Sequence, residues 1–317
     1  MPREKGFDRY NMKHVKLRFQ LDWKPNAQFA GVLLAHHRGW YARSNIDLDL
    51  LPWQPYTNPM EALESEENML CSTEDNLHLI ARAQGKYVKA IGAMMQYSGI
   101  GWMSLKTSHI QSITHLVGKR VGVHGDGITA LKIALRQSGV HETDVEIVEA
   151  GYNCGELLAT REFDVLQCYV MAEPVYLRRQ GFDLSVIRAY ESGYEVYAQV
   201  ISTTDRLLAH EPEALTRFLK VTFDGWRHAL THPAEAAGVI TQHYLPEASA
   251  EAEAETLSAS RPIIEGDLGL SKLGWMTSQR WAKSIGYLAA HHLIDQPLRA
   301  EDVMTNSFME QADALTT

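Results

Sequence analysis

The sequence predicts an α/β protein made of two lobes. Stretches rich in Val, Ile and Leu alternate with amphipathic stretches along the chain, a pattern typical of strands that alternate with helices. The 317 residues, of which 45% are hydrophobic and 22% charged, are enough to form two cores of common domain size. We therefore expect two sheets, each covered by helices.

The first lobe is predicted to begin with a strand, a turn, a helix and a second strand. The helix, residues 27–41, has apolar side chains at helical spacing and ends at an Arg-Gly stop. Further on, "NMLCSTEDNL" predicts a very short strand that leads into a helix start at Ser72-Thr73-Glu74. We expect the chain to cross into the second lobe near Leu105-Lys106. The strands expected in this lobe are residues 15–21, 46–51, 69–71, 90–96 and 101–106.

The second lobe is predicted to repeat the alternation of strands and helices with short connections. Its expected elements are strands 120–124, 145–149 and 165–169 and helices 128–138 and 154–160. The alternating run "SGYEVYAQVISTTD" is expected to return the chain to the first lobe. Helices are expected after it at residues 212–231, 233–244, 248–259, 277–292 and 300–304. The lobes are thus assigned as residues 15–105 plus 196–317 and residues 106–195.

Composition excludes several classes of protein. The net charge is −9, and no cluster of Lys and Arg offers a surface for nucleic acid. No run of about 18 apolar residues predicts a membrane span. The first residues lack the apolar core of a secretory signal. We expect a periplasmic protein if a signal has been removed and a cytoplasmic one if the chain is complete as given.

The cysteines and histidines predict neither a disulfide framework nor a metal site. Cys71, Cys154 and Cys168 are an odd set with wide spacing, and the 14 His are scattered. We expect the three cysteines to be buried thiols.

The first candidate site is the turn "DWKPN". Pro25 ends the strand and Asn26 is a natural N-cap, so helix capping explains both residues. It does not explain Trp23. In open α/β sheets ligands bind outside the carboxyl ends of strands, where a Trp can stack on a planar ring. Asp22 and Gln28, on either side, are included as candidate ligand contacts.

The second candidate is "VGVHGDGITALK". His124 and the turn Gly125-Asp126-Gly127 follow a strand and precede a helix, where free N–H groups and the helix dipole favour an anion or a strong acceptor. The alternative is an ordinary tight turn, in which Asp126 discourages a phosphate.

Two further candidates involve acidic and aromatic side chains. Glu173 follows a strand end and either accepts hydrogen bonds from an aminopyrimidine or ribityl group or caps the helix that Pro174 begins. Tyr194, Glu195 and Tyr197 lie on the expected return crossing, with Tyr194 and Glu195 on opposite faces of an extended segment.

Four segments together resemble one known family. They are "LDWKPNAQFAGVLLAHHRGWYARSNIDLDL", "GKRVGVHGDG", "FDVLQCYVMAEPVYLRRQG" and "TTDRLLAHEPEALTRFLKVTFDGWRHALTHPAEAAGVI". The family unites fungal-type thiamine pyrimidine synthase with bacterial ABC-transporter substrate-binding proteins for pyrimidine thiamine precursors, riboflavin and sulfonates. The resemblance runs from about Val15 to Ile294. It implies a periplasmic-binding-protein type II fold with the ligand between two lobes, Trp23 stacked on a heteroaromatic ring and Asn26 anchoring it.

The chain departs from the synthase branch of that family. The resemblance implies a Lys that holds pyridoxal phosphate, a His one turn later, and a cysteine-rich motif for iron. Here Thr73 stands at the Lys position and Leu77 at the His position, with His78 one place off, and "SGYEVYAQV" contains no cysteine. We therefore expect no cofactor, no metal and no synthase chemistry.

The sequence thus predicts a solute-binding protein that closes on a small planar heterocycle, most closely a thiamine-related pyrimidine, with Thr73 and Glu74 among its ligand contacts. Its expected partner is an ABC permease or a sensor protein. One alternative is a synthase-like enzyme that acts on pyridoxal phosphate. Another is a ligand-sensing module, with Trp226 and the helical C-terminal third as its contact surface.

Overall fold

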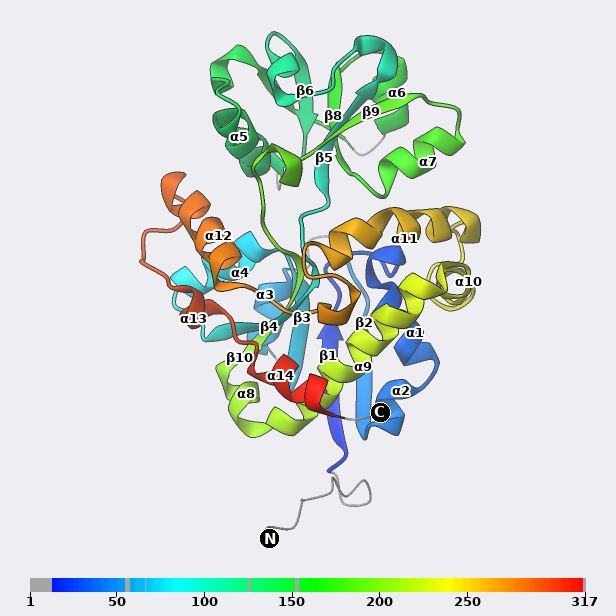
Figure 1. The fold of residues 1–317 in the computed structure, drawn as a ribbon, viewed down its shortest axis with the longest axis vertical. Coiled ribbons are helices and arrows are strands. Elements are labelled where there is room, and N and C mark those ends of the chain that lie inside the picture. The colour runs from blue at the N-terminus through cyan, green and yellow to red at the C-terminus, as the bar shows by residue number, and fades with distance from the viewer. Residues whose placement is uncertain (1–12, 55–57, 66, 125–126, 152–153, 316–317) are drawn as a thin grey trace.

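The computed structural model describes residues 13–54, 58–65, 67–124, 127–151 and 154–315. Two lobes, each with its own sheet, lie one above the other in Figure 1 and are joined by two chain segments. The expectation of two α/β lobes is therefore confirmed.

The larger lobe contains a five-stranded sheet in the order β2-β1-β3-β10-β4. β1 pairs in parallel with β2 and β3, whereas β10 is antiparallel to both of its neighbours. Helices cover both faces, so the central strand β3 is buried along its whole length. The strands are β1 (Val15–Gln20), β2 (Ile46–Leu51), β3 (Met69–Thr73), β4 (Val88–Met95) and β10 (Ala198–Thr204).

The helices of this lobe come from both ends of the chain. From the N-terminal half they are η1 (Ala27–Phe29), α1 (Ala30–His37), α2 (Trp40–Arg43), α3 (Pro59–Ser65) and α4 (Asp75–Ala83). From the C-terminal part they are α8 (Asp205–His210), α9 (Pro212–Thr231), α10 (Pro233–His243), α11 (Ala250–Glu265), α12 (Ser278–Ala290), α13 (Ala300–Val303) and α14 (Ser307–Ala314). The helix expected at residues 248–259 is α11, which continues through Pro262 and ends at Glu265.

Helices α1 and α9 approach closely because each has a glycine at the contact. A Cβ on Gly225 would lie 2.2 Å from the Gly31 carbonyl oxygen, and one on Gly31 would lie 2.3 Å from Cγ of Trp226. Trp226 is fully buried in this contact. The expectation that it forms a surface for a partner is therefore wrong, because α1 already covers it.

The smaller lobe contains the sheet β7-β6-β8-β5-β9. Its strands are β5 (Ile100–Leu105), β6 (Arg120–Val123), β7 (Glu146–Glu149), β8 (Val165–Tyr169) and β9 (Leu184–Arg188), and its helices are α5 (Gly127–Gln137), α6 (Cys154–Ala159) and α7 (Glu173–Arg179). Short 3-10 turns are η2 (Lys106–Ser108), η3 (Ile113–Leu116) and η4 (Glu142–Asp144) here, η5 (Tyr190–Ser192) on the return crossing and η6 (Leu270–Lys272) in the larger lobe.

The sheet membership of β5 corrects the expected position of the first crossing. β5 is antiparallel to β8 and β9, so the chain leaves the larger lobe after Met95 and not near Leu105. The return segment lies between β9 and β10. Tyr97 and Tyr190, one from each crossing, stack with ring centroids 4.7 Å apart. The two connections therefore support each other.

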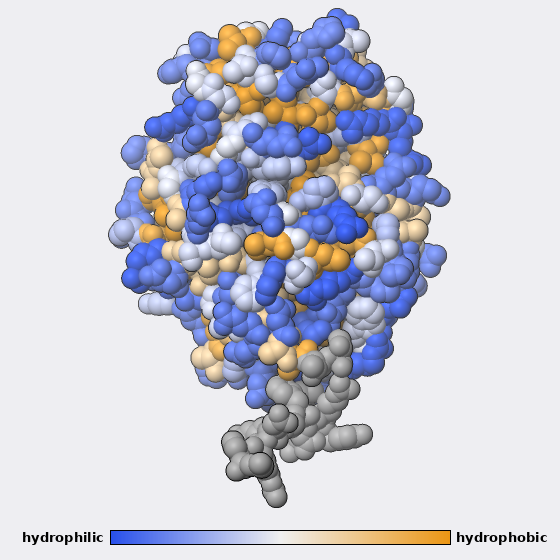
Figure 2. All heavy atoms as spheres, viewed as in Figure 1, coloured by the Kyte–Doolittle hydropathy of each residue, from blue (hydrophilic) through white to orange (hydrophobic). Residues whose placement is uncertain are grey.

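The visible face of the molecule is mainly hydrophilic, with apolar groups in scattered patches (Figure 2). Among the described residues, no helix has the length and apolar character that crossing a bilayer requires.

Candidate functional site: a cavity between the lobes

A cavity of about 730 Å³ lies between the two lobes. This volume falls within the range of small-molecule sites. The larger lobe lines it with Asp22, Trp23, Asn26, Gln28, Trp53, Pro59, Glu74, Leu77 and Gln199. The smaller lobe contributes His124, Cys154, Gly155, Glu156, Gln167, Cys168, Tyr169, Ala172, Glu173, Tyr176, Leu177 and Gln180.

Asp22 follows the end of β1 and is held by two side chains from neighbouring strands. The Ser72 hydroxyl lies 3.0 Å from its Oδ1, and the Gln199 amide nitrogen donates to its Oδ2 at 3.4 Å. Loss of hydration raises the pKa of Asp22 to about 6, although these two hydrogen bonds lower it. The carboxyl group therefore remains mostly ionised at neutral pH.

Gln199 reaches this position through an unusual backbone conformation. Its φ is +51°, in the left-handed region that a residue with a side chain seldom adopts. Such strain costs on the order of 1–3 kcal/mol and is concentrated at ligand sites and switches. This backbone conformation places the Gln199 amide in the cavity wall, directly beside the return crossing.

Trp23 and Trp53 form an aromatic wall. Both follow the carboxyl end of a strand, β1 and β2 respectively, and these strands are parallel neighbours. Their ring centroids are 4.8 Å apart with an interplanar angle of 49°. Both rings are partly exposed and line the cavity, so they offer π-faces to a flat molecule.

Asn26 and Gln28 belong to the turn into η1. The Asn26 side chain accepts a hydrogen bond from the Gln28 backbone N–H at 3.0 Å, as an N-cap does. Both side chains also line the cavity. Capping and ligand contact are therefore compatible roles for Asn26.

On the opposite wall, His124 and Gln167 meet at the start of α5. The His124 backbone N–H donates to Gln167 Oε1 at 2.8 Å, and its ring Nδ1 lies 3.1 Å from the Ala150 carbonyl oxygen. Because a carbonyl only accepts, Nδ1 carries the proton. Gly127 begins α5 behind this pair, and Gly125 and Asp126 lie outside the described residues.

Tyr169, at the end of β8, connects the two walls. Its hydroxyl donates to Glu74 of the larger lobe at 3.1 Å, and its backbone N–H donates to Glu173 at 2.7 Å. Burial, together with the neighbouring Glu74 carboxylate, raises the pKa of the Tyr169 phenol. The hydroxyl therefore stays protonated and remains a donor.

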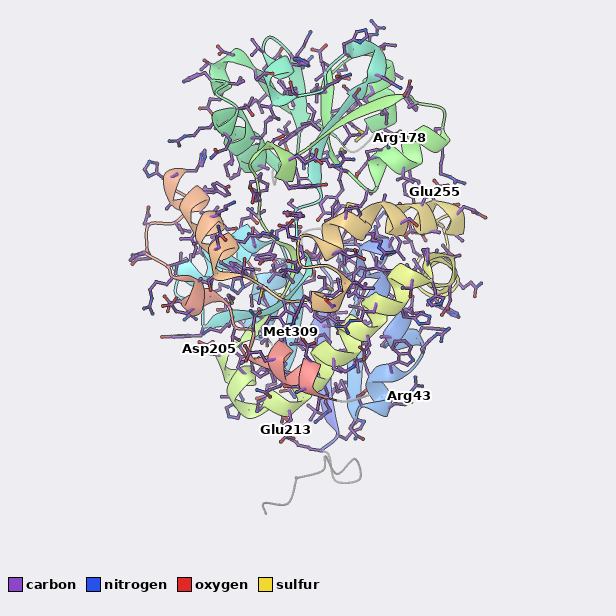
Figure 3. The ribbon with its side chains drawn as sticks, viewed as in Figure 1. Arg43, Arg178, Asp205, Glu213, Glu255 and Met309 are labelled. Atoms are coloured by element: carbon purple, nitrogen blue, oxygen red, sulfur yellow. The ribbon has the colours of Figure 1, made fainter. Side chains whose placement is uncertain are left out.

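A second connection between the lobes lies at the edge of the cavity. Glu253 on α11 is 2% exposed and accepts hydrogen bonds on both oxygens. The Ala27 backbone N–H donates to Oε2 and the Tyr176 hydroxyl of α7 donates to Oε1, each at 2.6 Å. Figure 3, which labels Arg178 and Glu255, shows α7 and α11 facing each other across the gap. Glu253 thus joins the "DWKPN" turn to the smaller lobe.

Five of the predicted site residues do not line the cavity in the described part of the chain. Thr73 is fully buried, and Gly127 is covered by the Gln167 side chain. Tyr194 and Tyr197 are buried, and Glu195 pairs with Lys283 of α12 at 2.7 Å. Packing of the return crossing against the C-terminal helices explains the position of the last three.

The structure adds several cavity residues that the sequence analysis missed. The most prominent are Trp53, Gln167, Tyr169, Tyr176 and Gln199. Trp53 and Tyr169 follow the same rule as Trp23, since each stands at the carboxyl end of a strand. That rule would have found both of them. No local signal in the sequence marks Gln199 or Tyr176.

The cysteines are free and buried, and Cys154 and Cys168 lie in the cavity wall. Burial raises the pKa of the Cys154 thiol to about 11 and that of Cys168 well above its ordinary value. They are poor nucleophiles in this state. Within the described ranges, no group of three or more His, Cys, Asp or Glu side chains is arranged to hold a metal ion.

The family model described as "NMT1/THI5 like" matches residues 26–236, which is more than half of the chain. The chain belongs to the NMT1/THI5-like family. The resemblance inferred from the four sequence segments is therefore confirmed.

Relatives in this family have ligand-binding and synthase names. The riboflavin-binding protein RibY of Chloroflexus aurantiacus is 26% identical over 91% of this chain and 84% of its own length. The formylaminopyrimidine-binding protein of Halalkalibacterium halodurans is 25% identical over 90% and 88%. A 4-amino-5-hydroxymethyl-2-methylpyrimidine phosphate synthase of Legionella pneumophila is 22% identical over 87% and 88%.

Solved structures establish the fold. The periplasmic aliphatic sulphonate binding protein SsuA of Escherichia coli matches with a TM-score of 0.72 at 15% identity, over 93% of this chain and 99% of its own. A Candida albicans protein described as having the generic periplasmic binding protein fold matches with a TM-score of 0.63 at 15% identity, over 92% and 96%. The expected periplasmic-binding-protein fold is therefore confirmed.

Proposed function

We propose that this protein binds a small planar heterocycle, most closely a thiamine-related pyrimidine, and closes its two lobes on it. The observation that carries the proposal is the cavity between the lobes, in which an aromatic pair faces a set of hydrogen-bonding side chains. A flat, nitrogen-rich ring needs both a π-face and acceptors for its N–H groups. The names of the riboflavin-binding and formylaminopyrimidine-binding relatives support this class of ligand.

Trp23 and Trp53 are proposed to hold the ring, and polar groups set its orientation. Stacking on an aromatic side chain is worth about 0.5–1.5 kcal/mol beyond the burial of apolar area. Asp22 and Glu74 supply carboxylate acceptors from the larger lobe. Tyr169 and Glu173 face them from the smaller lobe. A ligand held from both sides favours the arrangement in which the lobes are close.

Closure is proposed to be a shift between open and closed arrangements about the two crossings. The bonds from Tyr169 to Glu74 and from Tyr176 to Glu253 join different lobes, so they exist only when the lobes are together. Ligand contacts and these bonds therefore add to the stability of the same state.

The physiological partner is proposed to be an ABC permease that receives the ligand. Support comes from the name of one structural neighbour, the ligand-binding component of an ABC-type import system from Staphylococcus aureus. Its TM-score is 0.67 at 13% identity, over 94% of this chain and 98% of its own. Release of a bound ligand to a permease requires the lobes to reopen about the two crossings.

The test is a thermal-shift and calorimetric screen with pyrimidine thiamine precursors, riboflavin, pyridoxal phosphate, sulfonates and nitrate. A ligand present at 100 times its Kd should stabilise the protein by ~2.7 kcal/mol. Trp23→Ala should abolish tight binding. Trp40→Ala is the matched control, because Trp40 packs against the same core cluster but does not line the cavity.

Two results would contradict the proposal. One is a screen in which no planar heterocycle raises the melting temperature. The other is an equal loss of binding in the Trp23 and Trp40 variants, because that would assign both effects to a damaged lobe.

A further inference from the structure

The charged side chains of the cavity wall are acidic. No Lys or Arg lines the cavity among the described residues, and residues 125–126 and 152–153, which the structure does not describe, contain neither. The carboxylates that line it are Asp22, Glu74, Glu156 and Glu173. An anionic group placed among them would be repelled, and no Lys or Arg of the described wall would offset that repulsion.

At the start of α5 in the smaller lobe, a side-chain oxygen of the protein lies where an anion would otherwise approach. The N-terminus of a helix attracts anions through its free N–H groups. At α5, however, the His124 N–H donates to Gln167 Oε1, and a Cβ on Gly127 would lie only 1.8 Å from that same oxygen. The Gln167 amide oxygen therefore lies beside the described start of α5.

Two further turns that face the cavity have backbone donors already bound by carboxylates. At the end of β8 the Tyr169 N–H donates to the Glu173 carboxylate. In the larger lobe the Ala27 N–H donates to Glu253. These backbone donors are satisfied by internal carboxylates, so a phosphate would have to displace a charged group that is already hydrogen-bonded.

An unpartnered side chain indicates what the cavity accepts instead. Gln28 is 6% exposed and lines the cavity, and its side-chain amide makes no hydrogen bond with the described residues. Its polar atoms remain accessible from the cavity, where water or a ligand can bind them. It supplies both a donor and an acceptor, which suits an uncharged polar group.

We infer that the cavity selects an uncharged or cationic heterocycle rich in N–H or O–H donors, and that it rejects the same heterocycle when it carries a phosphate or sulfonate. This inference rests on the proposed function, since it specifies the charge of that ligand. It separates the protein from sulfonate binding, although the fold is shared with a sulphonate-binding protein. It also disfavours a phosphorylated pyrimidine or pyridoxal phosphate in the cavity.

The experiment compares matched ligands by titration calorimetry. One pair is riboflavin and flavin mononucleotide. The other is 4-amino-5-hydroxymethyl-2-methylpyrimidine and its phosphate, with the acetate ester of the same alcohol as an uncharged control for size. In whichever pair binds, we expect the Kd of the phosphate to be at least about 100-fold higher than the Kd of the alcohol. The reason is that like-charge contacts in a desolvated site are strongly unfavourable. The acetate ester should bind within about tenfold of the alcohol.

A charge-neutral variant tests the cause. The double variant Glu74→Gln and Glu173→Gln keeps an acceptor for each Tyr169 bond but removes two charges. It should reduce the ratio of the phosphate Kd to the alcohol Kd by about tenfold or more. Glu255→Gln is the control, because it removes one charge from α11 without touching the cavity wall. It should leave the preference unchanged.

Each outcome decides the inference. Equal or tighter binding of the phosphate overturns it and leaves the proposed function standing. An acetate ester as weak as the phosphate, or an unchanged preference in the double variant, also overturns it, because size would then explain the selection. If neither member of either pair binds, the inference fails, and the wider screen of planar heterocycles decides the proposed function separately.

Discussion

Tyr176→Phe is the sharpest test of how the lobes close. The change removes one hydroxyl, which donates at 2.6 Å from the smaller lobe to Glu253 of the larger lobe. Glu253 is 2% exposed, so in the closed form water cannot easily replace the lost donor. The fold of each lobe should be unaffected, because the bond lies between lobes and within neither.

The magnitude follows from the chemistry of the pair. A hydrogen bond to a charged group contributes about 1.5–3 kcal/mol, which corresponds to roughly 10- to 100-fold in the equilibrium between open and closed forms. If the ligand-free protein is mainly open, this factor appears directly in the ligand Kd. We therefore expect Tyr176→Phe to weaken binding by about 10- to 100-fold, chiefly through faster dissociation.

The assay is calorimetry for the Kd, with small-angle X-ray scattering to measure closure on ligand addition. Arg179→Gln is the matched control, because Arg179 pairs with Glu255 between the same two helices but both side chains are substantially exposed. An exposed pair contributes about 0–1 kcal/mol, so the control should change the Kd by less than roughly fivefold. Tyr176 also lines the cavity, and a double-mutant cycle with Glu253→Gln separates closure from direct ligand contact.

The reasoning is refuted if Tyr176→Phe and Arg179→Gln have the same small effect. It is also refuted if the effects of Tyr176→Phe and Glu253→Gln are additive, since partners in one bond must be coupled.

Two further predictions concern stability. Burial raises the pKa of Asp75 to about 7, so the folded state binds its proton more tightly than the unfolded state, and this carboxyl makes the protein less stable as pH rises from about 4 to 7. Asp75→Asn should therefore raise the free energy of unfolding by about 2–4 kcal/mol at pH 8 and change it little at pH 4. The measurement is urea unfolding of the variant and of the wild type at both pH values. A difference between the two proteins that does not depend on pH would contradict this. Burial lowers the pKa of His78 to about 4, so this side chain makes the protein more stable as the pH rises. It does so equally in the variant and in the wild type, so its contribution cancels in their difference. Gly225→Ala should destabilise by about 1–3 kcal/mol, because its Cβ would overlap the Gly31 carbonyl. Gly238→Ala in α10, with open space around its Cβ, should instead be neutral or stabilising, and equal melting temperatures for the two would refute the packing argument.

Local sequence patterns predicted the bounds of several strands and helices correctly. β2 and α9 have the bounds expected from alternation and from the proline that begins the helix. The strand of β5 was also expected within a residue, but it was assigned to the wrong lobe. Its run of buried residues marks a strand without indicating its partners, because pairing depends on segments that lie far apart in the chain.

The candidate site was predictable to a similar degree. Asp22, Trp23, Asn26 and Glu173 stand at strand ends that the sequence marks with turns, and all of them line the cavity. The return crossing was harder. Tyr194, Glu195 and Tyr197 look like ligand contacts in an extended segment, but α12 and its neighbours cover them, which only their packing reveals.

The sequence by itself determined the order of strands and helices, the acidic balance and the family, because propensity, capping and composition act over a few residues or over the whole chain. Only the tertiary structure decided which strand ends line the same cavity and which carboxylates accept hydrogen bonds from the opposite lobe. The bond between Ala27 and Glu253 joins residues 226 positions apart, and no local pattern encodes such a contact. It forms because two helices from opposite parts of the chain must bury their apolar faces against the same sheet, and this packing brings the polar partners together.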